Sequence, residues 1–172
     1  MTALLVVYCL WCAVLCGYDL NIRRLPNVLT LGGAFGFLLV QYLLYGAPGL
    51  VAAFAAASVA GLFLVLPWLM RAAGGGDVKM MFAAGAAVGW GGLLDLLILT
   101  SLAGMVMAIT LLAAGAVSSV RVSHFIQSIL NPWYDRKAGS ATLPSRVDER
   151  VRMPFSMAIA IGMMTTLWVG VM

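Results

Sequence analysis

Charged residues are scarce in this sequence. Of its 172 residues, 9% are Asp, Glu, Lys or Arg and 63% are hydrophobic. A soluble domain carries about 25% charged and about 45–50% apolar residues, so this chain has too little polar surface to cover a water-soluble core. The same composition excludes disorder and a coiled coil. We therefore expect an all-α integral membrane protein, because the chain consists largely of apolar runs of the length that a span needs.

Cysteine and histidine are also rare, with three Cys and one His in the chain. Cys9, Cys12 and Cys16 all lie in the first apolar run. Their spacings place them on one face of a helix, where small side chains let helices pack closely. Cys9 and Cys12 form a Cys-x-x-Cys pair, but no further ligand stands near it, and His124 has no partner in the sequence. We expect no metal site and no cofactor.

Six apolar runs predict six membrane spans in a single domain, residues 1–172. Residues 78–120 hold two charged side chains, Lys79 near their start and Asp95. As a helix they would extend about 60 Å, which is enough for two crossings, divided by the glycine-rich turn at 89–92. The expected spans are residues 3–17, 28–45, 50–70, 78–88, 93–117 and 153–172. A polar loop, residues 121–152, precedes the last span.

Every basic residue lies in or directly beside one of three gaps between these spans. They are Arg23, Arg24, Arg71, Lys79, Arg121, Arg136, Lys137, Arg146, Arg150 and Arg152. The positive-inside rule assigns the three gaps to the cytoplasm and both termini to the outside. Because the first basic residue follows the first apolar run, we expect that run to be a retained span. The net charge of +4 then reflects topology, and no nucleic-acid partner is expected.

Two acidic residues lie beside spans on the cytoplasmic side of this topology. Asp19 follows the first span and Asp77 precedes the fourth, so both are expected at a similar depth. Two carboxylates at one depth suit an aspartic protease, in which one activates a water molecule and the other protonates the leaving amine. Gly74, Gly75 and Gly76 precede Asp77 and allow the close approaches that would bring it toward the first span.

Simpler roles for the two acids stay open. Asp77 is suited to capping a helix N-terminus, and Asp19 can pair with Arg23 one helical turn on. The glycines before Asp77 also suggest a phosphate loop. That interpretation fails, because no Gly-Lys-Ser/Thr follows and an acid stands where phosphate would approach.

Three segments resemble the type IV prepilin peptidases, membrane aspartic proteases with a Gly-x-Gly-Asp motif. Residues 74–77 match that motif, and Val78 and Lys79 continue it in the usual way. Residues 19–27 resemble the first catalytic segment, an Asp followed by basic residues and Pro-Asn. Residues 152–160 resemble the segment that opens the last span. The three segments occur in the expected order, and the resemblance covers nearly the whole chain.

The resemblance implies a peptidase that removes the short basic leader from prepilins and pseudopilins at the cytoplasmic face of the bacterial inner membrane. It implies that Asp19 and Asp77 are the catalytic pair and that the three glycines form the active-site loop. Lys79 faces away from Asp77 on a helix, so it is either an interfacial anchor or a contact for an acid of the substrate. The candidate substrate-binding residues are Arg23, Arg24, Pro26, Asn27 and Lys79.

One departure from the family narrows the expected activity. Larger members carry an added cytoplasmic segment with paired Cys-x-x-Cys motifs, associated with N-methylation of the cleaved pilin. This chain has no cysteine after Cys16. It resembles the short, peptidase-only branch that serves Flp (tight-adherence) pili, so no methyltransferase activity is expected.

Two other classes of protein remain as alternatives. A small proton-coupled carrier would place ionisable residues near the bilayer midplane, and the middles of the expected spans have none, which counts against it. A non-catalytic membrane subunit of a pilus or secretion machine would keep the fold without needing the two acids.

Overall fold

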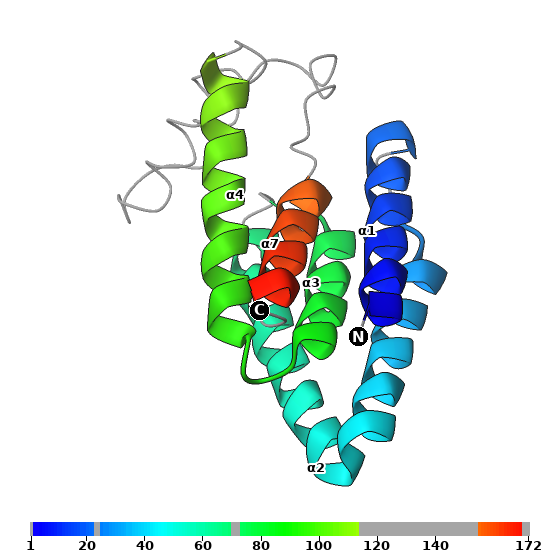
Figure 1. Ribbon diagram of the computed structural model, residues 1–172. Helices are drawn as coiled ribbons and strands as arrows, with labels where there is room; N and C mark the ends of the chain where they lie inside the picture. The colour runs from blue at the N-terminus through cyan, green and yellow to red at the C-terminus, as the bar shows by residue number, and fades with distance from the viewer. Residues whose placement is uncertain (1, 23–24, 70–72, 114–154, 170–172) are drawn as a thin grey trace. The chain divides into compact units, whose positions relative to one another are not determined.

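The computed structural model describes residues 2–22, 25–69, 73–113 and 155–169. Regular secondary structure in these residues is helical throughout (Figure 1). The helices are α1 (Thr2–Ile22), α2 (Asn27–Leu69), α3 (Gly75–Val88), α4 (Leu93–Ala113) and α7 (Phe155–Val169). The loop expected at 121–152 and the residues Arg23 and Arg24 lie outside the described residues.

The chain divides into two compact units. The first comprises Met1–Gly104 and Pro154–Met172, and the second comprises Met105–Met153. Of the second unit, the described residues are 105–113, which form the last part of α4. The contacts among α1, α2, α3 and α7 all lie within the first unit.

Three of the described helices are long and apolar enough to cross a membrane. The segments are Leu4–Ile22, Asn27–Leu69 and Leu93–Thr110, and α7 is a shorter apolar helix. Many of their large apolar side chains are exposed in the isolated chain, as is expected of surfaces that face lipid. The chain is therefore an all-α membrane protein, which confirms the expected fold class at that level.

Helix α2 is bent sharply at Gly46. Its 43 residues would extend about 65 Å as a straight helix, which is twice the hydrocarbon thickness. Gly46 interrupts it with φ 69° and ψ −160°, a positive-φ conformation that glycine adopts without strain. Figure 1 shows that α2 reverses direction, so that its two arms run in opposite senses. The reversal begins at Gly46, in the gap between the expected spans 28–45 and 50–70.

Small residues let the second arm of α2 pack closely against α3. Ala56, Ala57 and Ala60 are fully buried and face Gly85 of α3. A Cβ atom on Gly85 would lie 2.7 Å from the Cβ of Ala60 and 2.9 Å from the carbonyl oxygen of Ala56. The two helices could not approach so closely with a side chain at this position.

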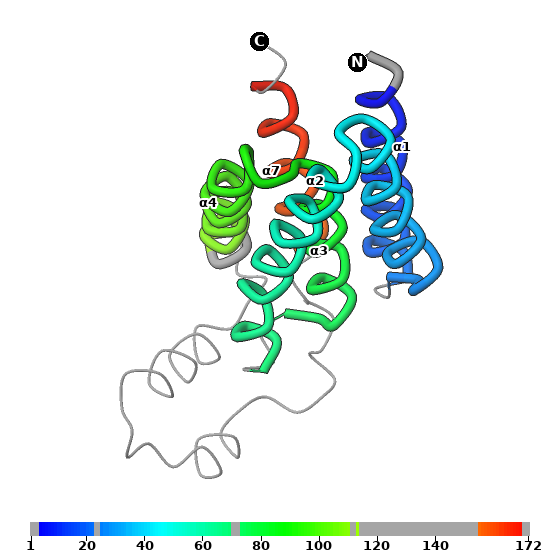
Figure 2. Tube along the Cα trace, turned by 90° about the horizontal axis from the view of Figure 1, so that it is seen from below, coloured from blue at the N-terminus to red at the C-terminus, as the bar shows by residue number. Residues whose placement is uncertain are grey.

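The cysteine face of α1 packs on α7. The Cys9 thiol donates to Sδ of Met164 at 3.1 Å, and the Cys12 thiol donates to Sδ of Met163 at 3.8 Å. This confirms that the cysteines share one helix face and serve helix packing. Helix α7 packs against α3 as well as against α1, and Figure 2 shows α7 beside α3.

Four helix ends lie at the same end of the first unit. They are the end of α1 and the beginnings of α2, α3 and α7, which all lie in the upper half of the first unit as drawn in Figure 1. Asp19 belongs to the first of these ends and Asp77 to the third. The alternation of up and down helices thus brings the two acid-bearing segments to one end of the unit.

Candidate active site

Asp19 lies in the last turn of α1, because α1 continues to Ile22 and so extends beyond the span expected to end at residue 17. Its side chain is half-buried. The hydroxyl of Ser156, at the start of α7, donates to Oδ2 of Asp19 at 2.5 Å. Ser156 itself is completely buried. This hydrogen bond attaches the end of α1 to the beginning of α7.

Asp77 lies in the first turn of α3 and caps that helix. The N–H of Gly74 donates to Oδ2 of Asp77 at 2.9 Å, and the N–H of Asp77 donates to the carbonyl of Gly74 at 3.1 Å. A carboxylate at this position also interacts favourably with the positive end of the helix dipole. The capping role expected for Asp77 is confirmed, and it orients one carboxylate oxygen.

Gly76 is the glycine of the loop at which a side chain would not fit. A Cβ atom on Gly76 would lie 2.9 Å from Cβ of Leu25 and 3.2 Å from its Cδ1. The first turn of α3 therefore lies directly against the segment that leads from α1 into α2. The absence of a side chain at Gly76 permits this close approach to Leu25.

Lys79 contacts the beginning of α2. Its Nζ donates to Oδ1 of Asn27 at 2.7 Å. The carbonyl of Pro26, one residue earlier, accepts the N–H groups of Leu29 and Thr30 at 3.1 Å each and so completes the first turn of α2. Two of the candidate substrate-binding residues, Lys79 and Asn27, therefore bind each other and connect α3 to α2.

Ser156 is the site residue that the sequence analysis did not single out. The available signal was a lone hydroxyl two residues after Pro154, in a run that is otherwise apolar. That signal identifies a polar residue at the start of a helix but not its partner, because Asp19 lies at the other end of the sequence.

These contacts join α1, α2, α3 and α7 at one end of the first unit. The two carboxylates at this end each have one oxygen held by a donor, a hydroxyl for Asp19 and a backbone N–H for Asp77. Carboxylates held in defined orientations are suited to moving protons between a water molecule and a substrate. Among the described residues, no group of three His, Cys, Asp or Glu side chains could hold a metal ion.

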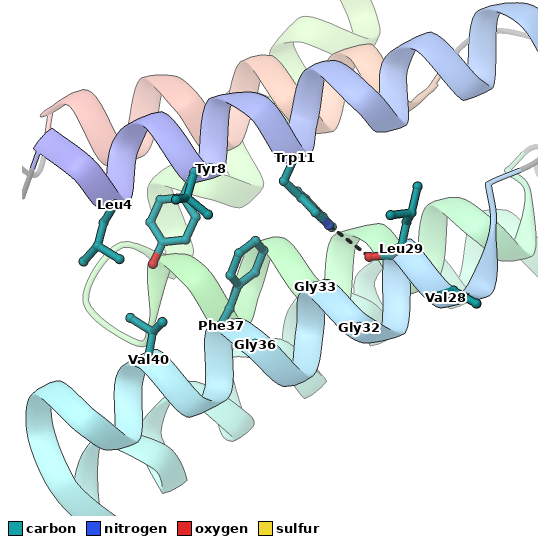
Figure 3. Close-up of a pocket in the computed structure, with 11 residues that line it drawn as sticks. Leu4, Tyr8, Trp11, Val28, Leu29, Gly32, Gly33, Gly36, Phe37 and Val40 are labelled. Carbon is teal, nitrogen blue, oxygen red and sulfur yellow. Dashed lines mark hydrogen bonds between the residues drawn. The ribbon is translucent and has the colours of Figure 1, made fainter.

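A separate apolar pocket of about 360 Å³ lies between α1 and the first arm of α2 (Figure 3). Trp11 lies across Gly33, where a Cβ atom would overlap the indole ring, and its Nε1 donates to the carbonyl of Leu29 at 2.9 Å. No carboxylate lines this pocket. It therefore adds no acid–base group to the site formed around Asp19 and Asp77.

Comparison with known proteins identifies one family. A family model described as the type IV leader peptidase family matches residues 6–109. The matched segment contains Asp19, Asp77 and the three glycines, and it ends before α7. No curated protein and no solved structure matches the chain.

Proposed function

Because the chain belongs to the type IV leader peptidase family, we propose that it is a membrane aspartic endopeptidase that cleaves type IV prepilins and pseudopilins. It removes the short basic leader at the point where the leader joins the apolar helix of the substrate. The proposed substrates are those of Flp pili, and the activity does not include methylation of the cleaved product.

The arrangement of Asp19 and Asp77 is the observation that carries this proposal. The two acids come from helices that are distant in sequence, and their helix ends lie at one end of the first unit (Figure 1). One carboxylate accepts a proton from water as the water attacks the scissile carbonyl, and the other donates a proton to the leaving amine. The reaction needs one acid and one base, and the two carboxyl groups supply them together.

The length of α3 supports a site just inside the cytoplasmic edge of the bilayer. Its 14 residues are about 21 Å long, whereas the hydrocarbon core is about 30 Å thick. Trp90, exposed just beyond the end of α3, suits the outer interface. With Trp90 there, the start of α3 lies roughly 9 Å below the cytoplasmic edge of the hydrocarbon core, and Asp77, in the first turn of α3, lies slightly deeper. This depth matches the junction of a polar leader and a membrane helix.

The positions of the basic residues support the orientation. Arg23 and Arg24 connect α1 to α2 in the sequence, Arg71 lies between α2 and α3, and Arg152 precedes α7. All of them adjoin helix ends at the acid-bearing end of the first unit, so the positive-inside rule assigns that end to the cytoplasm. With the two arms of α2 as separate crossings, six spans and two outer termini follow. The proposed location is the bacterial inner membrane.

The substrate is proposed to bind at this same end. Lys79 Nζ donates to Oδ1 of Asn27, and a lysine Nζ has three N–H donors. It can therefore also pair with an acidic side chain near the new N-terminus of the pilin. The residues proposed to contact the substrate are Arg23, Arg24, Pro26, Asn27 and Lys79.

Co-expression with a tagged Flp-type prepilin, followed by a gel assay of leader removal, tests the proposal. Wild-type protein, Asp19→Asn and Asp77→Asn are compared at equal membrane levels. Asp95→Asn is the matched control, because Asp95 is exposed in the first turn of α4 and has no proposed role. We expect cleavage by the wild type and by the control, and none by the other two variants.

Two results would contradict the proposal. Cleavage by both Asp19→Asn and Asp77→Asn would refute the catalytic pair. The protein would then be a peptidase that uses other catalytic residues. Failure of the wild type to cut a panel of prepilins and pseudopilins would refute the activity itself and favour a carrier or a non-catalytic subunit.

A further inference from the structure

We infer that Ser156 is a positioning residue for the reaction, and that α7 acts through it to hold the Asp19 carboxylate in its working orientation. The inference rests on the proposed function, because it assigns a role to a residue that contacts a proposed catalytic acid. Ser156 lies outside residues 6–109, so the family match does not include it.

The first argument is the geometry of the hydrogen bond. Ser156 Oγ lies 2.5 Å from Oδ2 of Asp19, at the short end of the range for a hydroxyl that donates to a carboxylate. A bond of this kind fixes the rotation of the carboxyl group about its Cβ–Cγ axis. Asp19 lies in the last turn of α1 and is half-buried. Among the described residues, the donor that orients its carboxylate comes from another helix, α7.

The second argument is the burial of Ser156. Its side chain is completely buried, and a buried hydroxyl without a partner is costly. Thr165 and Thr166 of the same helix satisfy their hydroxyls with carbonyls one turn earlier, within α7 itself. Ser156 lies in the first turn of α7, where no such carbonyl precedes it inside the helix. Its hydroxyl is thus directed to another helix, and its acceptor is Asp19.

The third argument is that α7 packs against both acid-bearing helices. It packs against α1, which carries Asp19, and against α3, which carries Asp77. A helix that contacts both can keep the two carboxylates in register. Cys16, one turn before Asp19, is a titratable side chain that interacts with both Ser156 and Asp19. The cluster is therefore a polar junction between α1 and α7 in an otherwise apolar interface.

The test compares Ser156→Ala with wild type and with Thr166→Val in purified proteoliposomes. Thr166 is buried on the same helix, and its hydroxyl bonds to the carbonyl of Gly162, so this control removes a buried hydroxyl that contacts no carboxylate. We expect Ser156→Ala to lower kcat about tenfold, because a hydrogen bond to a charged group is lost, and to leave KM unchanged. Thr166→Val keeps the wild-type kcat.

The pH profile separates positioning from a loss of folded protein. Ser156→Ala removes a donor directly from a proposed catalytic carboxylate, so the shape of its pH–rate profile differs from that of the wild type. A smaller amount of folded enzyme would lower the rate equally at every pH. Ser156→Thr retains the donor and is expected to keep the wild-type profile.

Each outcome has one interpretation. If Ser156→Ala has the wild-type kcat and pH profile, or if Ser156→Thr shifts the profile as Ser156→Ala does, the inference is wrong and the proposed function stands. If wild-type protein in the same vesicles does not cleave prepilin, the proposed function fails and the inference fails with it.

Discussion

Gly76 provides the sharpest test of how the site is built. In Gly76→Ala, the added Cβ would lie 2.9 Å from Cβ of Leu25 and 3.3 Å from its Cγ. Carbon atoms at rest lie about 3.5–4.0 Å apart, so one side must move by roughly 0.6–1.1 Å. The Cβ of Leu25 is attached to the backbone, and no side-chain rotation moves it away. The shift must therefore move α3 relative to the segment between α1 and α2.

A shift of this size is expected to lower activity strongly. Asp77 follows Gly76 directly, and Leu25 belongs to the segment that leads away from Asp19. A misplacement of about 1 Å at reacting groups can cost about 100-fold in rate. We therefore expect kcat/KM of Gly76→Ala to fall about 100-fold. Alanine also has a higher helix propensity than glycine, so the loss would not reflect a weaker α3.

The assay is leader removal by purified protein in proteoliposomes, with Gly17→Ala as the control. Gly17 lies on α1, and a Cβ atom there meets nothing within 4 Å, so we expect this variant to retain wild-type activity. Adding Leu25→Gly to Gly76→Ala removes the atoms that clash and should restore most of the lost activity. Wild-type activity of Gly76→Ala, or no rescue by Leu25→Gly, would refute the reasoning.

Two further variants probe packing and the Lys79 contact. Gly162→Ala is expected to lower the free energy of unfolding by about 1–3 kcal/mol, because its Cβ would lie 2.8 Å from the backbone nitrogen of Thr100. Thermal unfolding in detergent measures this loss. The control is Gly36→Ala, whose Cβ would meet nothing within 4 Å and which should unfold like the wild type. In a double-mutant cycle, the effects of Lys79→Met and Asn27→Leu on the free energy of unfolding should show a coupling energy of about 1 kcal/mol. Strictly additive effects would contradict the 2.7 Å hydrogen bond between the two side chains.

Local sequence patterns predicted the helical segments well, because hydropathy depends on residues near one another in the chain. The apolar runs correspond to helices, and the cysteine spacing identified the face of α1 that packs on α7. The capping role of Asp77 was also predictable, since its partner Gly74 is three residues away. The exact bend in α2 was not, because Gly46, Pro48 and Gly49 are all suited to a turn.

Contacts between distant segments were beyond the reach of sequence patterns. Helix α1 extends to Ile22, so Asp19, which was expected after the first span, lies within the helix. The bonds of Ser156 to Asp19 and of Lys79 to Asn27 join different helices. No periodicity in one segment encodes which residue of another segment it will meet. These are also the contacts that orient the candidate site.

The central claim is that Asp19 and Asp77 act as one catalytic unit. The most direct measurement is kcat/KM for prepilin cleavage by Asp19→Asn, Asp77→Asn and the double variant, each reconstituted at a known protein concentration. Residues that act as a unit are strongly non-additive. The account therefore requires both single variants to fall to the same low rate and the double variant to fall no further. The account would be contradicted if the losses in kcat/KM of the two single variants multiplied in the double variant, or if either single variant kept substantial activity.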